Sequence, residues 1–262
     1  MLFIKTLALA LLFSSIGFKT FIYFITIGYG LSIFVIGGFL LLSIHEFTCI
    51  KIIIGVLYII YGLRLSLFLL IRDLKSESYN KKMKGVIKEK KDIKMGKQIF
   101  VWISVSLLYA CLTSPLTFRI LSTKEDGTFP YIGIMIIIFG QLFEVKADKE
   151  KSDAKIKNPH RFVDTGLYRI VRCPNYLGEL IFWTGNFIAG IKIYEGFLQW
   201  FIALSGYFCI VFIMFSGARR LELRQNKSYG KDPEYQKYSK TTPILIPLIP
   251  LYSVEKYTWL RA

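Results

Sequence analysis

Polar and charged side chains gather between Ala147 and Glu179 of a sequence that contains long apolar runs. Arg169 and Arg172 are three residues apart, and their planar guanidinium groups are suited to phosphate oxygens. This pattern predicts a site for a polyanionic ligand. The alternative is an interfacial loop with ordinary arginine and tyrosine anchors.

The residues around Pro174 predict the start of a helix. Proline disfavours a helical conformation at the residue before it, so a new membrane helix is expected to begin at Asn175. Asn175, Tyr176 and Glu179 then lie on its first turn, and Asn175 and Glu179, four residues apart, share a face. An amide and a carboxylate would project together into the bundle, at a helix end that favours anions.

Two further arginines, Arg64 and Arg220, are candidates for the same site. Arg64, which follows Tyr61 in the run Tyr-Gly-Leu-Arg, lies inside a long apolar segment. An ionisable group at that depth indicates an internal partner or a ligand, unless its long stem reaches the membrane surface. Arg220 follows the last apolar segment, where it either anchors the helix end or completes the polyanion site.

The elements that must position these groups are membrane helices. The sequence has 262 residues, 53% of them hydrophobic and 16% aromatic, with a mean hydropathy of +0.46. Such a chain is too apolar for a soluble domain of this size. Because a span needs about 20 mostly apolar residues, we predict an all-α bundle of about seven spans. They are Leu2 to Phe18, Phe21 to Ile44, Ile50 to Ile71, Phe100 to Leu121, Phe129 to Phe143, Leu177 to Ile191 and Phe197 to Phe215.

The charges between these spans predict an orientation. The segment from Arg72 to Lys97 holds ten Lys and Arg against four Asp and Glu, and the stretch Glu144 to Tyr176 and the tail from Arg219 are also basic. Basic loops stay on the cytoplasmic side. We therefore expect the N-terminus outside and the C-terminus in the cytoplasm.

Composition argues against several other functions. The net charge of +16 arises from basic residues between apolar runs, which argues against a nucleic-acid partner and for contact with membrane lipids. The chain has only two histidines, His45 and His160, and four scattered cysteines without a CxxC pair, so neither a metal site nor a disulfide framework is expected.

Nothing in the sequence divides the chain, so residues 1–262 are expected to form a single transmembrane domain. Residues 1–71 would supply the helices on the side of a lipidic substrate, and residues 140–250 the cofactor region. Leu2 to Phe18 is interpreted as a retained first helix, although a signal peptide is the alternative.

The motifs resemble the steroid 5α-reductase-like family in its bacterial-type branch. The resemblance rests on Asp148 after a small residue, the run Gly-Leu-Tyr-Arg ending at Arg169, and the segment Arg172 to Glu179 with Trp183 and Gly185. Sterol reductases share the arginine, the Pro-Asn-Tyr triplet and the Gly-acidic pair. Isoprenylcysteine and phospholipid methyltransferases share the general architecture. The sequence departs from the usual pattern at Cys173, where the family has histidine before Pro-Asn-Tyr.

The resemblance implies a cytosol-facing NADPH pocket and a hydrogen bond from Tyr61 to a substrate carbonyl. The positions that match the cofactor pocket are Asp148, Arg169, Arg172, Asn175, Tyr176, Glu179 and Arg220, and Arg64 is added from the segment after Tyr61. The expected activity is NADPH-dependent reduction of a carbon-carbon double bond in a steroid- or isoprenoid-like lipid.

Two other classes of function stay open at this point. One is a methyltransferase that uses S-adenosylmethionine on a lipid or isoprenylcysteine-type acceptor, and the other is a lipid-binding membrane protein without catalysis. The expected location is a bacterial inner membrane, or the endoplasmic reticulum membrane in a eukaryote.

Overall fold

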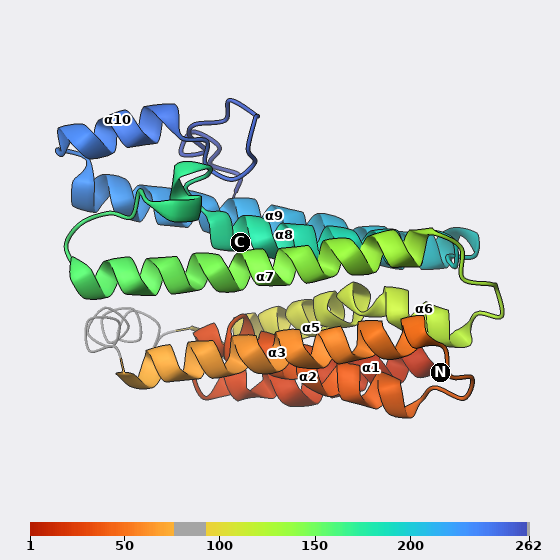
Figure 1. Ribbon diagram of the computed structural model, residues 1–262. Helices are drawn as coiled ribbons and strands as arrows, with labels where there is room; N and C mark the ends of the chain where they lie inside the picture. Colours follow the sequence, from red (N-terminus) through yellow and green to blue (C-terminus); the bar gives the residue numbers. More distant parts are fainter. Residues whose placement is uncertain (76–92, 261–262) are drawn as a thin grey trace. The chain divides into compact units, whose positions relative to one another are not determined.

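The apolar segments form helices, and the computed structural model, which describes residues 1–75 and 93–260, contains no strand in those ranges. The α-helices are α1 (Leu2–Ser14), α2 (Ile27–Leu42), α3 (Cys49–Lys75), α5 (Met95–Leu112), α6 (Ser114–Leu121), α7 (Phe129–Lys157), α8 (Pro174–Gly190), α9 (Gly196–Tyr229) and α10 (Pro233–Thr241) (Figure 1). Three short 3-10 helices lie between them, η1 (Ser15–Phe18), η2 (Phe21–Phe24) and η3 (Gly166–Arg169).

Five helical segments within the described ranges are long and apolar enough to cross a membrane. They are Phe21–Leu42, Cys49–Leu74, Met95–Leu112, Phe129–Lys157 and Gly196–Tyr229. They support the predicted class, an α-helical membrane protein with several spans. The count of seven, the orientation and the choice of membrane stay predictions. Most of the basic segment between Arg72 and Lys97 lies outside the described residues.

Several predicted boundaries differ from the structure. The predicted loop after Phe143 is helical as far as Lys157, and α9 continues past Phe215 to Tyr229. Both extensions are polar and neither contains proline. Gly217, the one glycine in them, lies inside α9 and does not end it, so the helix continues where the apolar part ends. The predicted span from Phe100 to Leu121 is divided at Thr113, because Pro115 stands in the first turn of α6.

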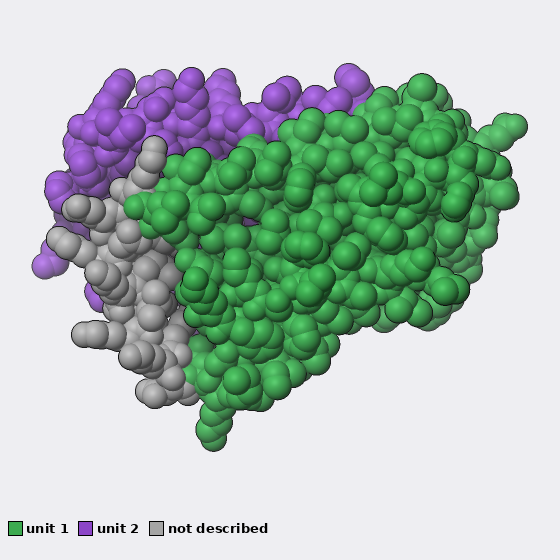
Figure 2. All heavy atoms as spheres, turned by 90° about the horizontal axis from the view of Figure 1, so that it is seen from below, with its two compact units in different colours: residues 1–131, 187–206 green, residues 132–186, 207–262 purple. Residues whose placement is uncertain are grey.

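The chain forms two compact units, coloured separately in Figure 2. Unit 1 consists of residues 1–131 and 187–206, and unit 2 of residues 132–186 and 207–262. Inside unit 1, α1 packs on α5, where the hydroxyls of Ser14 and Ser106 are 2.8 Å apart and the indole of Trp102 donates to the carbonyl of Leu11. The prediction of a single transmembrane domain is not tested by this division.

Glycines bring α2 and α3 together in unit 1. A Cβ atom at Gly62 would lie 2.4 Å from the carbonyl oxygen of Gly30 and 2.4 Å from the amide nitrogen of Phe34, too close for any side chain. One heptad further on, Gly37 faces the backbone of Gly55. Small residues at such positions let membrane helices approach closely.

The pair α7 and α8 of unit 2 is packed in the same way. A Cβ atom at Gly140 would lie 2.5 Å from the amide nitrogen of Phe182 and 2.8 Å from the carbonyl of Gly178. One heptad away, a Cβ atom at Gly185 would lie 2.7 Å from the carbonyl of Gly133. The backbones of the two helices therefore determine where the side chains of α8 stand.

Candidate functional site

The segment before α8 follows a path that is fixed by Gly166 and by the C-terminal tail. Gly166 has a φ of +60°, which favours glycine, and the amide of the next residue, Leu167, donates to the carboxylate of Glu150 on α7 at 2.7 Å. The amides of Arg172 and Cys173 then donate to the carbonyls of Pro243 and Ile244, at 2.8 and 3.0 Å. α8 begins at Pro174, one residue before the predicted start at Asn175.

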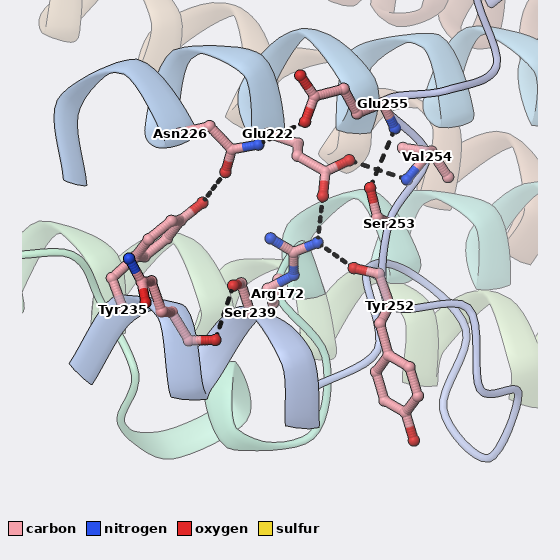
Figure 3. A network of polar contacts seen from close by, with 10 residues as sticks. Arg172, Glu222, Asn226, Tyr235, Ser239, Tyr252, Ser253, Val254 and Glu255 are labelled. Atoms are coloured by element: carbon pink, nitrogen blue, oxygen red, sulfur yellow. Dashed lines mark hydrogen bonds and ion pairs between the residues drawn. The ribbon is translucent and has the colours of Figure 1, made fainter. Parts of the chain in front are cut away.

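Arg172 is buried, with 1% of its surface exposed. Its Nη2 atom donates to Oε1 of Glu222 on α9 at 2.7 Å and to the backbone carbonyl of Tyr252 (Figure 3). The other carboxylate oxygen of Glu222 accepts from the amide of Val254 at 2.8 Å. The guanidinium thus has a protein counterion, and the predicted phosphate contact of Arg172 would have to compete with it.

The first turn of α8 holds Asn175, Tyr176 and Glu179. The side-chain oxygen of Asn175 is buried and has no hydrogen-bond partner among the residues described. Glu179 is 8% exposed, and the ring of Tyr176 packs on Gly217 of α9, where a Cβ atom would be 3.2 Å from the ring. Orphaned buried acceptors are uncommon in proteins, so the Asn175 oxygen is a candidate for a ligand contact.

The two remaining predicted arginines of unit 2 are exposed. Arg169 is the last residue of η3, and Arg220 lies on α9. The charges of Arg220 and of Arg224, one turn further along α9, act on the hydroxyl of Tyr176. Arg224 is not among the predicted cofactor residues, although its spacing of four from Arg220 is visible in the sequence.

Buried carboxylates also stand on α7, one turn apart. Asp148 was predicted from the resemblance, and Glu144, with 3% exposure, was not. Gly178 of α8 packs directly on Glu144 of α7. A Cβ atom added at Gly178 would lie 2.7 Å from the Cβ atom of Glu144. Burial, followed by the negative charge of Asp148, raises the pKa of the Tyr168 hydroxyl well above its ordinary value. This hydroxyl is therefore neutral at physiological pH.

Cys173, which stands where the family has histidine, is completely buried. Burial raises the pKa of its thiol to about 12. A neutral, inaccessible thiol at this position acts as a small apolar side chain rather than as a nucleophile.

The predicted substrate-side residues lie in unit 1. Tyr61 of α3 is fully buried, and its hydroxyl is 3.2 Å from that of Tyr29 on α2. Tyr29 stacks on Tyr109, whose hydroxyl donates to the carbonyl of Phe24 at 2.6 Å. Arg64 is partly buried, with its guanidinium carbon 5.7 Å from the centre of the Tyr61 ring. The sequence analysis missed Tyr29 and Tyr109.

The predicted residues thus form two sets, Tyr61 and Arg64 in unit 1 and the other seven in unit 2. The prediction that both sets line one pocket stays a prediction. Within the described ranges there is no group of three or more His, Cys, Asp or Glu side chains placed to hold a metal ion.

Comparison with known families matches residues 17–242 to a family described as protein of unknown function (DUF1295). No curated protein and no solved structure matches the chain. The family match begins inside η1, ends just after α10 and includes every predicted site residue. The chain therefore belongs to the DUF1295 family, a family of unknown function in the steroid 5α-reductase-like group.

Proposed function

We propose that this chain is a membrane-embedded reductase that uses NADPH to reduce a carbon-carbon double bond conjugated to a carbonyl in a lipidic substrate. The observation that carries the proposal is the first turn of α8. There, the orphaned oxygen of Asn175 lies beside Tyr176 and Glu179 in a chain of the steroid 5α-reductase-like group. The bacterial-type branch and a bacterial inner membrane belong to the same proposal.

The residues of unit 2 fit a dinucleotide in part. The orphaned Asn175 oxygen would accept a hydrogen bond from an amide such as that of the nicotinamide. Arg169 and Arg220, which are exposed, would hold phosphate oxygens, and Arg224 is a further candidate. Arg172 would act through the fold, since its charge is already paired with Glu222.

The residues of unit 1 would act on the substrate. When bound, NADPH supplies a hydride to the double bond. The Tyr61 hydroxyl would donate a hydrogen bond to the substrate carbonyl and stabilise the negative charge that develops on its oxygen. Tyr29, 3.2 Å away, would hold that hydroxyl in position.

Ligand-dependent thermal stability separates this proposal from its alternatives. A ligand that binds only the folded protein raises its melting temperature, by an amount that grows with the logarithm of the ligand concentration once that exceeds Kd. The purified protein in detergent is expected to be stabilised by NADPH, and neither by S-adenosylmethionine nor by NADH at the same concentration. Stabilisation by S-adenosylmethionine would support a methyltransferase, and stabilisation by lipids alone would support a lipid-binding protein.

A Tyr61→Phe variant tests the division of roles. It should keep the affinity for NADPH and lose turnover, because its hydroxyl acts on the substrate side. Tyr23→Phe is a matched control, since it removes a hydroxyl from a tyrosine of unit 1 outside the proposed site. Loss of NADPH affinity in Tyr61→Phe would contradict the assignment.

A further inference from the structure

The C-terminal strap, residues 243–260, is attached to the start of α8 and to α9. Ile244 and Leu245 are fully buried, and the carbonyl of Ile244 accepts from the amide of Cys173. Further along, the amide of Val254 donates to Glu222, which in turn binds Arg172 (Figure 3). The inner side of the strap is therefore part of the fold.

The strap also has exposed side chains, and the largest of them are apolar, although Glu255 and Lys256 are exposed as well. Leu248 is 99% exposed, and Ile249, Tyr252 and Trp259 are exposed by 48, 39 and 66%. The backbone of Leu248 has a φ of 65°. Among the non-glycine residues of the described ranges, it alone has a positive φ. Large apolar side chains presented together mark an interaction surface.

The contacts of the strap with α9 indicate what this surface meets. Three residues of α9 at heptad spacing, Phe212, Arg219 and Asn226, contact it. Asn226 and Arg219 bind the side chain and the carbonyl of Glu255, at 2.8 and 3.1 Å. Phe212 stacks on Trp259, with ring centroids 6.1 Å apart and planes 20° apart. The strap thus follows α9 from its polar end into its apolar part, and a membrane surface would cross α9 between the two.

The composition of the strap suits the boundary between lipid headgroups and acyl chains. Tryptophan and tyrosine concentrate at that boundary. Pro243, Pro247 and Pro250 have no amide hydrogen, and the amides of Ile244 and Leu251 donate within the strap at 2.9 and 2.7 Å. Irregular backbone is not stable deeper in the hydrocarbon, so the tip belongs at the boundary.

We propose that the C-terminal strap is a membrane-interface anchor, in which Leu248, Ile249 and Trp259 insert into a lipid surface while Arg172 and Glu222 hold its inner side. The partner is the bilayer itself, not a second protein. This inference does not depend on the reductase activity.

Spin labels on the full-length protein in phosphatidylethanolamine-phosphatidylglycerol nanodiscs test the anchor. The exposed Cys49 and Cys209 are first replaced by serine, and a label is placed at Leu248→Cys or, as the control on exposed polar α10, at Lys237→Cys. Collision rates with oxygen and with a water-soluble nickel chelate are then measured. We expect the Leu248 label to favour oxygen severalfold over the chelate and the Lys237 label to show the opposite preference.

Two results would overturn the anchor. Equal access of the chelate to both labels would place Leu248 in water. Protection of the Leu248 label from both oxygen and chelate would show that protein, such as a second copy of the chain, covers the strap. A label at Trp259→Cys repeats the test at the other end of the apolar surface.

Discussion

The α2/α3 pair of unit 1 and the α7/α8 pair of unit 2 are packed in the same way but contain different polar groups. Both antiparallel pairs use glycines seven residues apart, namely Gly30, Gly37, Gly55 and Gly62 in one and Gly133, Gly140, Gly178 and Gly185 in the other. Buried tyrosine hydroxyls stand on α2 and α3, whereas Glu144, Asp148 and Glu179 stand on α7 and α8. Neutral hydroxyls suit an uncharged lipid, and ionisable side chains suit a polar cofactor.

Each unit also contains an almost completely buried arginine. In unit 1, Arg119 is 2% exposed and binds Asp126 and the carbonyl of Ala189. In unit 2, Arg172 binds Glu222 and the carbonyl of Tyr252. Because both have a carboxylate and a backbone partner, they belong to the fold in this account. Exposed arginines such as Arg169 and Arg220 are then the ones available to a ligand.

The largest expected effect comes from Arg172→Ala. Removing one partner of a buried ion pair leaves the other charge uncompensated, which costs about 3–5 kcal/mol. Denaturant or thermal unfolding in detergent should therefore show a strongly destabilised protein. Arg169→Ala, an exposed control, should stay within about 0.5 kcal/mol of the parent. If the Arg172→Ala protein keeps the parental stability but binds NADPH more weakly, Arg172 contacts the cofactor and this account of its role is wrong.

Replacing a glycine at the helix contacts by alanine should lower the stability less than Arg172→Ala does. The loss should be similar in both units. Gly62→Ala and Gly140→Ala each place a Cβ atom against backbone of the neighbouring helix, so a loss of about 1–3 kcal/mol is expected. Gly38→Ala is the matched control, because no atom of the described residues lies within 4 Å of its Cβ position apart from its chain neighbours and its own helix backbone. It should be neutral or more stable by up to about 1 kcal/mol. Equal effects at Gly38 and Gly62 would contradict the packing argument.

A smaller effect on stability is expected at Asn175, with a selective effect on the cofactor. Asn175→Ala removes an oxygen without a protein partner, so stability should change by no more than about 0.5 kcal/mol. NADPH should bind about tenfold more weakly, as expected for a lost hydrogen bond of about 1.4 kcal/mol. Isothermal titration measures this change. Leu177→Ala, at a buried position on the same turn, should lower stability by about 2–5 kcal/mol instead.

Cys173 should show no reaction at all. Its raised pKa keeps the thiol neutral below about pH 12, and its burial excludes reagents. A membrane-permeant maleimide at pH 8 should modify Cys49, which is exposed at the start of α3, and leave Cys173 intact in the folded protein. Mass spectrometry of the digested protein detects each adduct, and rapid modification of Cys173 would show that the α8 start opens.

Local signals predicted much of the fold. Apolar runs of about 20 residues indicated the spans, and Pro174 correctly indicated the start of α8. The ends of α7 and α9 were missed because hydropathy indicates only which part of a helix lies in the membrane. It does not indicate how far the helix continues into water. A search for the next helix breaker would have found the end of α7, because Pro159 follows it by two residues, but not the end of α9, because Gly217 comes first and lies inside that helix.

Long-range contacts could not be predicted in the same way. The partners of Arg172 are 50 and 80 residues away in the chain, so its type and spacing suggested a phosphate contact instead. The Tyr29 and Tyr61 hydroxyls meet across 32 residues. The heptad spacing of the glycines was visible in the sequence, but only the structure shows which helices those glycines join.

The central claim, that this chain transfers hydride from NADPH to a lipid, is tested most directly with deuterium. The purified protein is incubated with a membrane lipid extract and NADPH deuterated at the transferable position of its nicotinamide, and lipids are analysed by mass spectrometry. The account predicts a lipid that gains one deuterium and one proton, and a Tyr61→Phe protein that binds NADPH but produces little of it. Tight NADPH binding without deuterium in any lipid, or deuterium incorporation that is unchanged in Tyr61→Phe, would contradict it.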